Sequence, residues 1–222
     1  MFLSMIRLDR DISPRDVFDL TKAGGYQVHR LIWNLFADSR DRRRDFLYRQ
    51  ETVNNWPTFY TVSERKPSFV CGSWEVKSKE YRPKLSAGQR LAFTLRANPI
   101  RSKRDEENKQ HRHDVVMEAK TRLRKNDEQT PLPALVQDEG SKWLLSRAER
   151  CGFQFKPEHI RVDGYRQHRF LKGKGNKQVS LSTLEFNGLL TVTDPSLFIE
   201  TLYTGIGPAK GFGCGLMLVR RV

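Results

Sequence analysis

Gly205-Ile-Gly-Pro-Ala-Lys-Gly-Phe-Gly-Cys-Gly215 is the most distinctive stretch of the chain, because five of its eleven residues are glycine. It lies between an amphipathic segment at 195–203 and an apolar run at 216–219. Glycine permits positive φ and close approach of another chain, and successive backbone N–H groups in such turns can bind an anion. We therefore expect the backbone of this loop and Lys210 to contact a phosphate-bearing partner. The alternative is a tight helix-to-strand turn packed under a core.

The spacing within this loop argues against two common nucleotide-binding motifs. A P-loop requires Lys followed by Ser or Thr after a Gly-x4-Gly pattern, which this loop lacks. A dinucleotide fingerprint opens a helix, whereas this loop leads into an expected strand at 214–220. An enzyme with a nucleotide cofactor is therefore disfavoured, no cofactor is expected, and a polynucleotide backbone is the better partner.

Charge and composition point in the same direction. The chain has 222 residues, a formal net charge of +14 and a pI of about 10.0. This imbalance indicates a polyanionic partner, with nucleic acid first and a membrane surface second. Its 13 Phe, 6 Tyr and 4 Trp argue against a disordered basic tail. No apolar run approaches the ~18 residues of a membrane helix. Three scattered cysteines predict neither a zinc site nor disulfides, and they favour the cytoplasm.

The order of expected elements is the same in both halves of the chain. The first half reads strand, helix, strand, strand, an unclear piece and a weak strand, at 2–8, 28–35, 46–49, 58–62 and 67–76. The second half reads strand, helix, strand, strand, helix, strand, at 90–98, 141–151, 153–165, 179–192, 195–203 and 214–220. This order predicts an α+β fold of two tandem ferredoxin-like (RRM-like) βαββαβ domains.

A proline-containing linker at 83–88 divides the two expected domains. We expect an N-terminal domain at 1–86 that carries the candidate catalytic residues. The C-terminal domain, 87–222, would carry a basic hairpin at 161–177 and the glycine-rich loop. The Lys/Arg-rich segment 101–125 is expected to be partly disordered without RNA, and 130–133 to act as a breaker.

A cluster of Tyr26, His29 and Arg30 is the candidate catalytic site. These residues are three or four apart and follow Gly24-Gly25, so they share one side of the first turn of an amphipathic helix. The helix dipole favours a phosphate there. An RNA 2′-OH can attack the adjacent phosphorus without a metal, given a base, an acid and a cation. His29 can be base or acid, Tyr26 can orient the 2′-OH, and Arg30 or Lys210 can stabilise the developing charge.

Other arrangements of polar residues are less informative. His29 has the alternative role of capping or packing a helix. His111 and His113 form a His-x-His pair in a basic segment without a third ligand, which we interpret as a solvated loop rather than a metal site. Asp105 to Glu107 is interpreted as a solvated run of charge. No metal site is therefore expected.

Four stretches together resemble the CasE family of CRISPR repeat endoribonucleases, the RNA-processing subunits of type I-E Cascade. They are the glycine-rich loop, the N-terminal apolar strand, the Tyr26-Gln-Val-His29 cluster and Leu95-Arg-Ala-Asn-Pro99. The Phe186-Asn-Gly188 strand extends the resemblance over nearly the whole chain. The loop and the Leu-Arg-Ala-Asn-Pro stretch are the most specific of these motifs.

The resemblance implies metal-independent cleavage on the 3′ side of the CRISPR repeat stem-loop, which leaves a 2′,3′-cyclic phosphate on a product that stays bound. It implies other Cascade subunits as partners, with no membrane and no small-molecule substrate. It assigns catalysis to His29 and Tyr26. The residues expected to bind RNA are Arg30, Lys210, Gly207, Gly211, Gly213, His168, Arg169, Lys172 and Lys174, of which the hairpin residues would enter the major groove.

Two alternatives remain at this point. One is a non-catalytic RNA-binding and assembly subunit that protects a guide RNA. The other, supported only by charge, is a DNA-binding or ribosomal-type protein. Convergence of Tyr26 and His29 on one exposed spot beside the glycine-rich loop would favour the nuclease.

Overall fold

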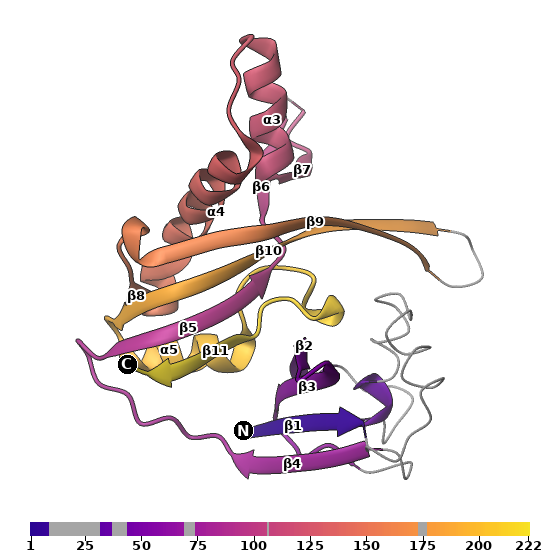
Figure 1. Cartoon of the computed structure of the whole chain (residues 1–222), viewed down its shortest axis with the longest axis vertical. Coiled ribbons are helices and arrows are strands. Elements are labelled where there is room, and N and C mark those ends of the chain that lie inside the picture. The colour runs from indigo at the N-terminus through magenta and orange to yellow at the C-terminus, as the bar shows by residue number, and fades with distance from the viewer. Residues whose placement is uncertain (9–31, 37–43, 69–73, 106, 173–176) are drawn as a thin grey trace.

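Two antiparallel sheets form the framework of the protein in a computed structural model, and a projection rises from the second sheet (Figure 1). The structure describes residues 1–8, 32–36, 44–68, 74–105, 107–172 and 177–222. Residues 81–89 join the sheets without regular secondary structure. The expected linker at 83–88 lies within this segment.

The N-terminal sheet consists of β1 (Phe2–Leu8), β2 (Phe46–Val53), β3 (Trp56–Ser63) and β4 (Trp74–Glu80) in the order β2-β3-β1-β4. This is the strand order of a ferredoxin-like unit. Asn54 and Asn55 connect β2 to β3 with φ of 53° and 60°, and two positive φ values are what a tight hairpin turn requires. The weak strand expected at the end of 67–76 is β4, which begins at Trp74 and lies at the edge of the sheet.

The C-terminal sheet has the same topology with a longer hairpin. It contains β5 (Arg90–Ala97), β8 (Phe153–Gln154), β9 (Ile160–Lys172), β10 (Lys177–Val192) and β11 (Met217–Arg221). The order is β11-β5-β10-β8, and β9 also pairs with β10. The range 153–165, expected to contain a strand, holds β8 and the start of β9, which a 3-10 turn at Pro157–His159 separates.

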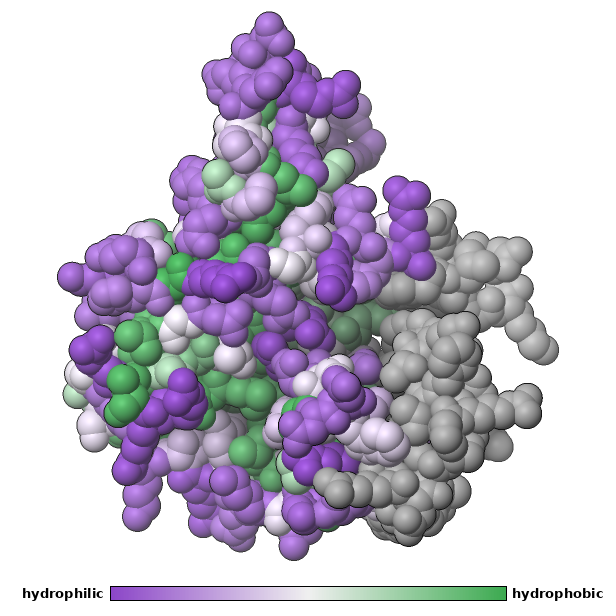
Figure 2. Space-filling model, viewed as in Figure 1, coloured by the Kyte–Doolittle hydropathy of each residue, from purple (hydrophilic) through white to green (hydrophobic). Residues whose placement is uncertain are grey.

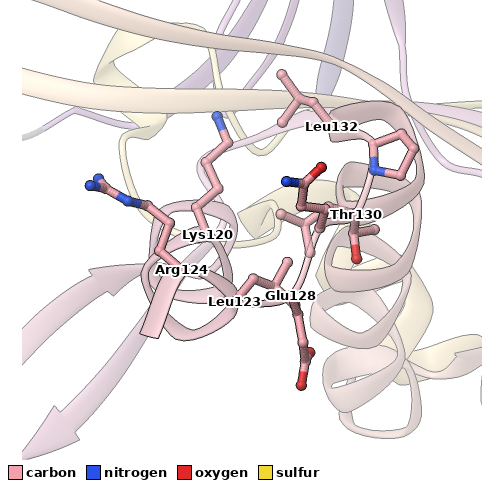
Figure 3. A pocket seen from close by; sticks show the side chains of 9 residues that line it. Lys120, Leu123, Arg124, Glu128, Thr130 and Leu132 are labelled. Atoms are coloured by element: carbon pink, nitrogen blue, oxygen red, sulfur yellow. The ribbon is translucent and has the colours of Figure 1, made fainter. Parts of the chain in front are cut away.

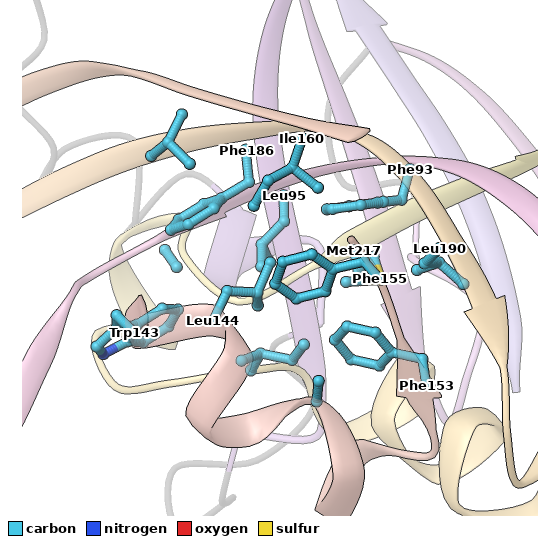
Figure 4. Close-up of a cluster of buried hydrophobic side chains, with 14 of the residues drawn as sticks. Phe93, Leu95, Trp143, Leu144, Phe153, Phe155, Ile160, Phe186, Leu190 and Met217 are labelled. Atoms are coloured by element: carbon cyan, nitrogen blue, oxygen red, sulfur yellow. The ribbon is translucent and has the colours of Figure 1, made fainter. Parts of the chain in front are cut away.

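Alternation along β5 builds the main core. Leu91, Phe93, Leu95 and Ala97 are buried, whereas the residues between them are not. On β10, the predicted face of Leu184, Phe186, Leu190 and Val192 is buried in the same cluster. Aromatic side chains from the helices and β8 complete it, as Figure 4 shows for Trp143 and Phe153. Burial of large apolar side chains, each worth about 1.5–3 kcal/mol, is the main stabilising term here.

Two helices of this unit begin at well-defined signals. Helix α5 (Pro195–Thr204) is capped by Asp194, whose Oδ1 accepts hydrogen bonds from the N–H groups of Ser196 and Leu197. Helix α4 (Leu132–Ala148) begins nine residues before the expected 141. The breaker expected at 130–133 is instead a helix start, because proline is well tolerated in the first helical turn.

Most of the described residues of the basic segment 101–125, where partial disorder was expected, lie in strands or a helix. The segment forms β6 (Ile100–Arg104), β7 (Gln110–Asp114) and α3 (Val115–Lys125), an insertion between β5 and α4 that projects at the top of Figure 1. Asp114 caps α3 through the N–H groups of Val116 and Met117. Val115 and Val116 anchor the insertion in the main core. His111 and His113 are exposed as expected, but on a strand rather than a loop.

The fold class predicted from sequence is confirmed: the chain contains two tandem ferredoxin-like units with a glycine-rich loop before the last strand. Part of the first helix, expected at 28–35, is seen at residues 32–34, and Ile32, Leu35 and Phe36 pack against Phe46 and Phe59 of the N-terminal sheet. The piece left unclear at 67–73 falls largely outside the described residues.

Candidate nucleic-acid interface

The predicted catalytic residues Tyr26, His29 and Arg30 lie outside the described residues, and so does Lys174 of the hairpin. Lys172 is the last residue of β9, where its backbone pairs with Lys177. The parts of the candidate interface that the structure describes are the glycine-rich loop, the base of the hairpin and the contact between the two sheets.

The glycine-rich loop is held closed at its two ends. The N–H of Ile206 donates to the Gly215 carbonyl at 2.9 Å, and the N–H of Gly215 donates to the Arg96 carbonyl at 2.7 Å. Gly207 has φ of +81°, and a Cβ there would lie 3.2 Å from the indole ring of Trp143. The loop therefore needs glycine both for its backbone conformation and for its contact with the core.

The far side of the loop packs against the N-terminal sheet. Tyr48 of β2 donates from its hydroxyl to the Gly211 carbonyl at 3.1 Å. Gly213 is buried with φ of +79°, and a Cβ there would lie 3.3 Å from the Tyr48 ring. The packed turn considered from sequence thus describes much of this loop. Binding of RNA by Gly207, Gly211 and Gly213 stays a prediction.

Lys210 sits at the outer turn of the loop beside a second cation. Burial lowers the pKa of Lys210, and the positive charge of Arg44 lowers it further. Arg44 precedes β2 and remains accessible to solvent, and partial desolvation of its guanidinium also lowers its pKa. Two cations that raise each other's electrostatic energy favour an anion between or beside them. Lys210, with Arg44 beside it, is therefore the residue of the loop best suited to bind a phosphate.

The base of the hairpin carries the remaining predicted residues. His168 and Arg169 are on β9, with His168 half-buried and Arg169 exposed. The His168 Nε2 lies 3.0 Å from the Thr183 Oγ1. Burial lowers the pKa of His168, and Arg96 and Arg166 lower it further, which favours neutral imidazole at pH 7. His168 is therefore better suited to donate or accept a hydrogen bond than to bind a phosphate as a cation.

A charge network that sequence reasoning missed lies in the seam between the two sheets. Glu185 of β10 binds Arg49 of β2, with its Oε2 3.0 Å from the Arg49 Nη2, and its Oε1 accepts from the Arg96 Nε of β5. Arg96 also donates through Nη1 to the Gln50 carbonyl at 3.0 Å. Alternation hides this residue, because Glu185 lies between the core residues Leu184 and Phe186 and is therefore expected on the solvent face of β10.

The tip of the insertion is hydrophilic on the face that Figure 2 shows. A cavity of about 660 Å³ lies between α3 and the start of α4 (Figure 3), and its lining includes Lys120, Leu123, Arg124, Glu128 and Leu135. It contains none of the residues predicted to bind RNA. The cavity is therefore separate from the loop and the hairpin.

Two searches of the described part of the chain gave negative results. Within it, no group of three or more His, Cys, Asp or Glu side chains is arranged to hold a metal ion. Among the helices described, none is long and apolar enough to cross a membrane.

Comparison with known proteins gives consistent matches over nearly the full chain. The sequence profile of a family described as "CRISPR associated protein" matches residues 1–221. The chain is 30% identical to the CRISPR system Cascade subunit CasE of Escherichia coli strain K12 over 196 residues, 86% of this chain and 89% of that one. It is 30% identical to the CRISPR-associated endoribonuclease Cse3 of Thermus thermophilus over 212 residues, 89% and 90% of the two chains.

Two solved structures share the fold. The structure of the CRISPR endoribonuclease Cse3 bound to 19 nt RNA matches with a TM-score of 0.70 and 27% identity over 99% of this chain and 100% of that one. Cas6e from Escherichia coli K-12 matches with a TM-score of 0.65 and 26% identity over the full length of both chains.

Proposed function

This chain belongs to the CRISPR-associated protein family, and from that premise we propose that it is an endoribonuclease that processes the repeats of precursor CRISPR RNA. In this proposal it binds the repeat stem-loop, cleaves on the 3′ side of the hairpin and keeps the product bound within Cascade. The observation that carries the proposal is the near full-length match to an RNA-bound endoribonuclease, Cse3, at 27% identity. CasE, which this chain also matches, is named as a Cascade subunit, and this name supports partnership of this chain with other Cascade subunits. We place this partnership in the cytoplasm.

The proposed reaction is a transesterification within the RNA. The 2′-oxygen forms a bond to the adjacent phosphorus, the bond from phosphorus to the 5′-oxygen breaks, and a 2′,3′-cyclic phosphate and a 5′-hydroxyl result. One proton leaves the 2′-oxygen and one is delivered to the 5′-oxygen. Side chains can carry out both transfers, so the proposed reaction requires no metal. His29 is the proposed acid or base, Tyr26 orients the 2′-OH, and Arg30 stabilises the charge on phosphorus.

The described residues support a division of labour between the two proposed domains, 1–86 and 87–222. The hairpin base presents exposed Arg166 and Arg169, which suit the phosphates of an RNA stem, and Lys172 and Lys174 are the proposed major-groove contacts. Lys210 and Arg44 lie where the second domain meets the first, so they suit the RNA backbone on its way to the cut site.

A cleavage assay in EDTA tests this proposal. Its substrate is the repeat RNA of the host, with and without a 2′-deoxy group at the cut site. We expect the wild type to cut only the 2′-hydroxyl RNA, and His29→Ala to lose at least about 100-fold in rate, as removal of a general acid or base does. His159→Ala is the matched control, since His159 is an exposed histidine in the turn before β9.

Each outcome of this assay has a definite meaning. Cleavage of the 2′-deoxy RNA would contradict attack by the 2′-oxygen. Full activity of His29→Ala would remove His29 from the site. Tight binding without cleavage by any form of the protein would leave a guide-protecting RNA-binding subunit as the function.

A further inference from the structure

Glu185 is the point at which the two sheets are joined by directional bonds to one carboxylate. Its two oxygens bind Arg49 of β2 and Arg96 of β5, and Arg96 continues to the Gln50 carbonyl of β2. Apart from the hydrogen bond of the Tyr48 hydroxyl to the Gly211 carbonyl, the neighbouring contacts of the seam described here are apolar. Leu47, Val62 and Leu216 form an apolar cluster, which is non-directional and tolerates sliding. The carboxylate therefore fixes the orientation that the apolar contacts leave adjustable.

The local structure of β9 and β10 aims Glu185 into the seam. The pairing register of these strands shifts between Thr183 and Glu185, as at a β-bulge, and bulges redirect side chains. Gly164 on the opposite strand has φ of +62°, and a Cβ there would lie 2.9 Å from the Glu185 Cγ. The absence of a side chain at 164 thus makes room for Glu185 at the root of the basic hairpin.

Arg49 depends on this carboxylate because it is almost fully buried, with 5% of its surface exposed. Its Nε is bound by Glu51 and its Nη2 by Glu185, while its Nη1 is buried without a hydrogen-bond partner in the described structure. A buried guanidinium that loses a partner charge is strongly disfavoured, so β2 shifts when Glu185 no longer holds it. Arg49 therefore transmits the position of β10 to the N-terminal sheet.

We propose that Glu185 is a positioning residue that sets the cleavage geometry by fixing the RNA-holding hairpin relative to the N-terminal unit. The inference rests on the proposed function, since it requires RNA to be held by the hairpin and cut by residues between β1 and β2. β10 is the return strand of the hairpin and carries Glu185, and β2 follows the Tyr26–Arg30 segment in sequence. Displacement of reacting groups by about 1 Å costs about 100-fold in rate, whereas hairpin contacts to RNA are unaffected.

The test separates RNA binding from cleavage in EDTA. Glu185→Gln removes the charge at constant shape, and single-turnover rates are measured at saturating protein alongside the Kd for repeat RNA. We expect the saturated rate to fall about 10- to 100-fold and the Kd to change less than about twofold. The matched control is Asp163→Asn, because Asp163 pairs across the strands with Glu185 but, among the residues that the structure describes, its carboxylate binds only Arg161 at the surface. This control is expected to keep both the wild-type rate and the wild-type Kd.

Two further variants separate geometry from folding. Glu185→Asp keeps the charge on a shorter side chain and is expected to lose less rate than Glu185→Gln. In a double-mutant cycle, Arg49→Met is expected to reduce the loss of rate caused by Glu185→Gln, since the Arg49–Glu185 contact is already gone and only the contact with Arg96 remains. Thermal unfolding of each variant confirms that the rates are measured on folded protein.

Several outcomes would overturn the inference. Equal cleavage by Glu185→Gln and Asp163→Asn would do so, as would a rise in Kd that accounts for the whole loss of rate, or additive losses in the cycle. A wild type that binds RNA without cutting it would overturn the proposed function itself, and the inference with it. Normal wild-type cleavage together with a silent Glu185→Gln would overturn the inference alone.

Discussion

The glycine-rich loop at 205–215 is enclosed between the two sheets, whereas the β9–β10 hairpin extends away from them (Figure 1). Gly213 to Gly215 are buried, and the loop touches Trp143 on one side and Tyr48 on the other. The hairpin base instead exposes Arg166, Gln167 and Arg169. Both regions are proposed to bind RNA, yet only one of them also holds the protein together. A substitution in the loop therefore affects stability, and one at an exposed hairpin residue such as Arg169 affects binding alone.

The largest effect that distinguishes the regions is expected for Gly205→Ala. Gly205 has φ of +77°, and a Cβ there would lie 2.8 Å from the Gly215 carbonyl oxygen and 2.9 Å from the Leu47 Cδ1. We expect a loss of about 2–4 kcal/mol in the free energy of unfolding, measured in urea. Gly88→Ala is the control, because its φ is +81° but no atom lies within 4 Å of the added Cβ. Equal losses would show that the loop is not tightly packed.

A smaller loss of stability is expected for Tyr48→Phe. Removal of the hydroxyl leaves the Gly211 carbonyl without this donor, at a cost of about 1 kcal/mol. Tyr60→Phe on the neighbouring strand is the control, since the Tyr60 hydroxyl has no hydrogen-bond partner within the ranges described. Chemical denaturation of both variants measures the difference. No difference between them would remove this bond from the seam.

The hairpin is expected to respond in the opposite way to Arg169→Ala. Loss of one exposed phosphate contact is worth about 0.5–1 kcal/mol, a two- to fivefold rise in the Kd for repeat RNA. The slope of log affinity against log salt should fall by about 1, with no change in stability. Arg82→Ala is the control, because Arg82 is exposed in the segment that joins the sheets. A loss of stability in Arg169→Ala would end the distinction between the two regions.

The smallest effect concerns the pH dependence of stability at His168. Its folded pKa lies below the ordinary 6.5, first because of burial and then because of Arg96 and Arg166. The unfolded chain therefore takes up the proton first, so this contribution is complete above pH 6.5 and is lost as pH falls through the folded pKa. When the pH is lowered from about 7 to about 5, the urea midpoint of unfolding should fall further for the wild type than for His168→Gln. Identical shifts would place His168 in solvent.

Alternating and capping patterns allowed much of the framework to be predicted from sequence. The range 2–8 was predicted for β1 and is confirmed, and the start of α5 followed from Asp194-Pro195. The insertion was not predicted, because its stability comes from Val115 and Val116 in the core, two apolar residues in a segment that otherwise reads as charged. Tertiary burial of a few residues outweighed local composition there.

The candidate site was predicted in part. Glycine density marked the loop, but the sequence does not show that its glycines face Trp143 and Tyr48, since both contacts join distant parts of the chain. Glu185 was overlooked for a similar reason. A charge inside a strand reads as the solvent face of that strand, and only the packing of a second sheet turns it into a bridge. The roles of Tyr26, His29 and Arg30 remain predictions.

The apolar cluster of the seam has a consequence for synthesis of the chain. Leu47 and Val62 emerge from the ribosome early, and Leu216, which covers them, follows Leu47 by 169 residues. At about 5–20 residues per second, this delay is about 8–34 s. The N-terminal sheet therefore stands for that time with one apolar face uncovered, where chaperones or neighbouring nascent chains can bind it. Slow translation after residue 62 is expected to lower the yield of folded protein.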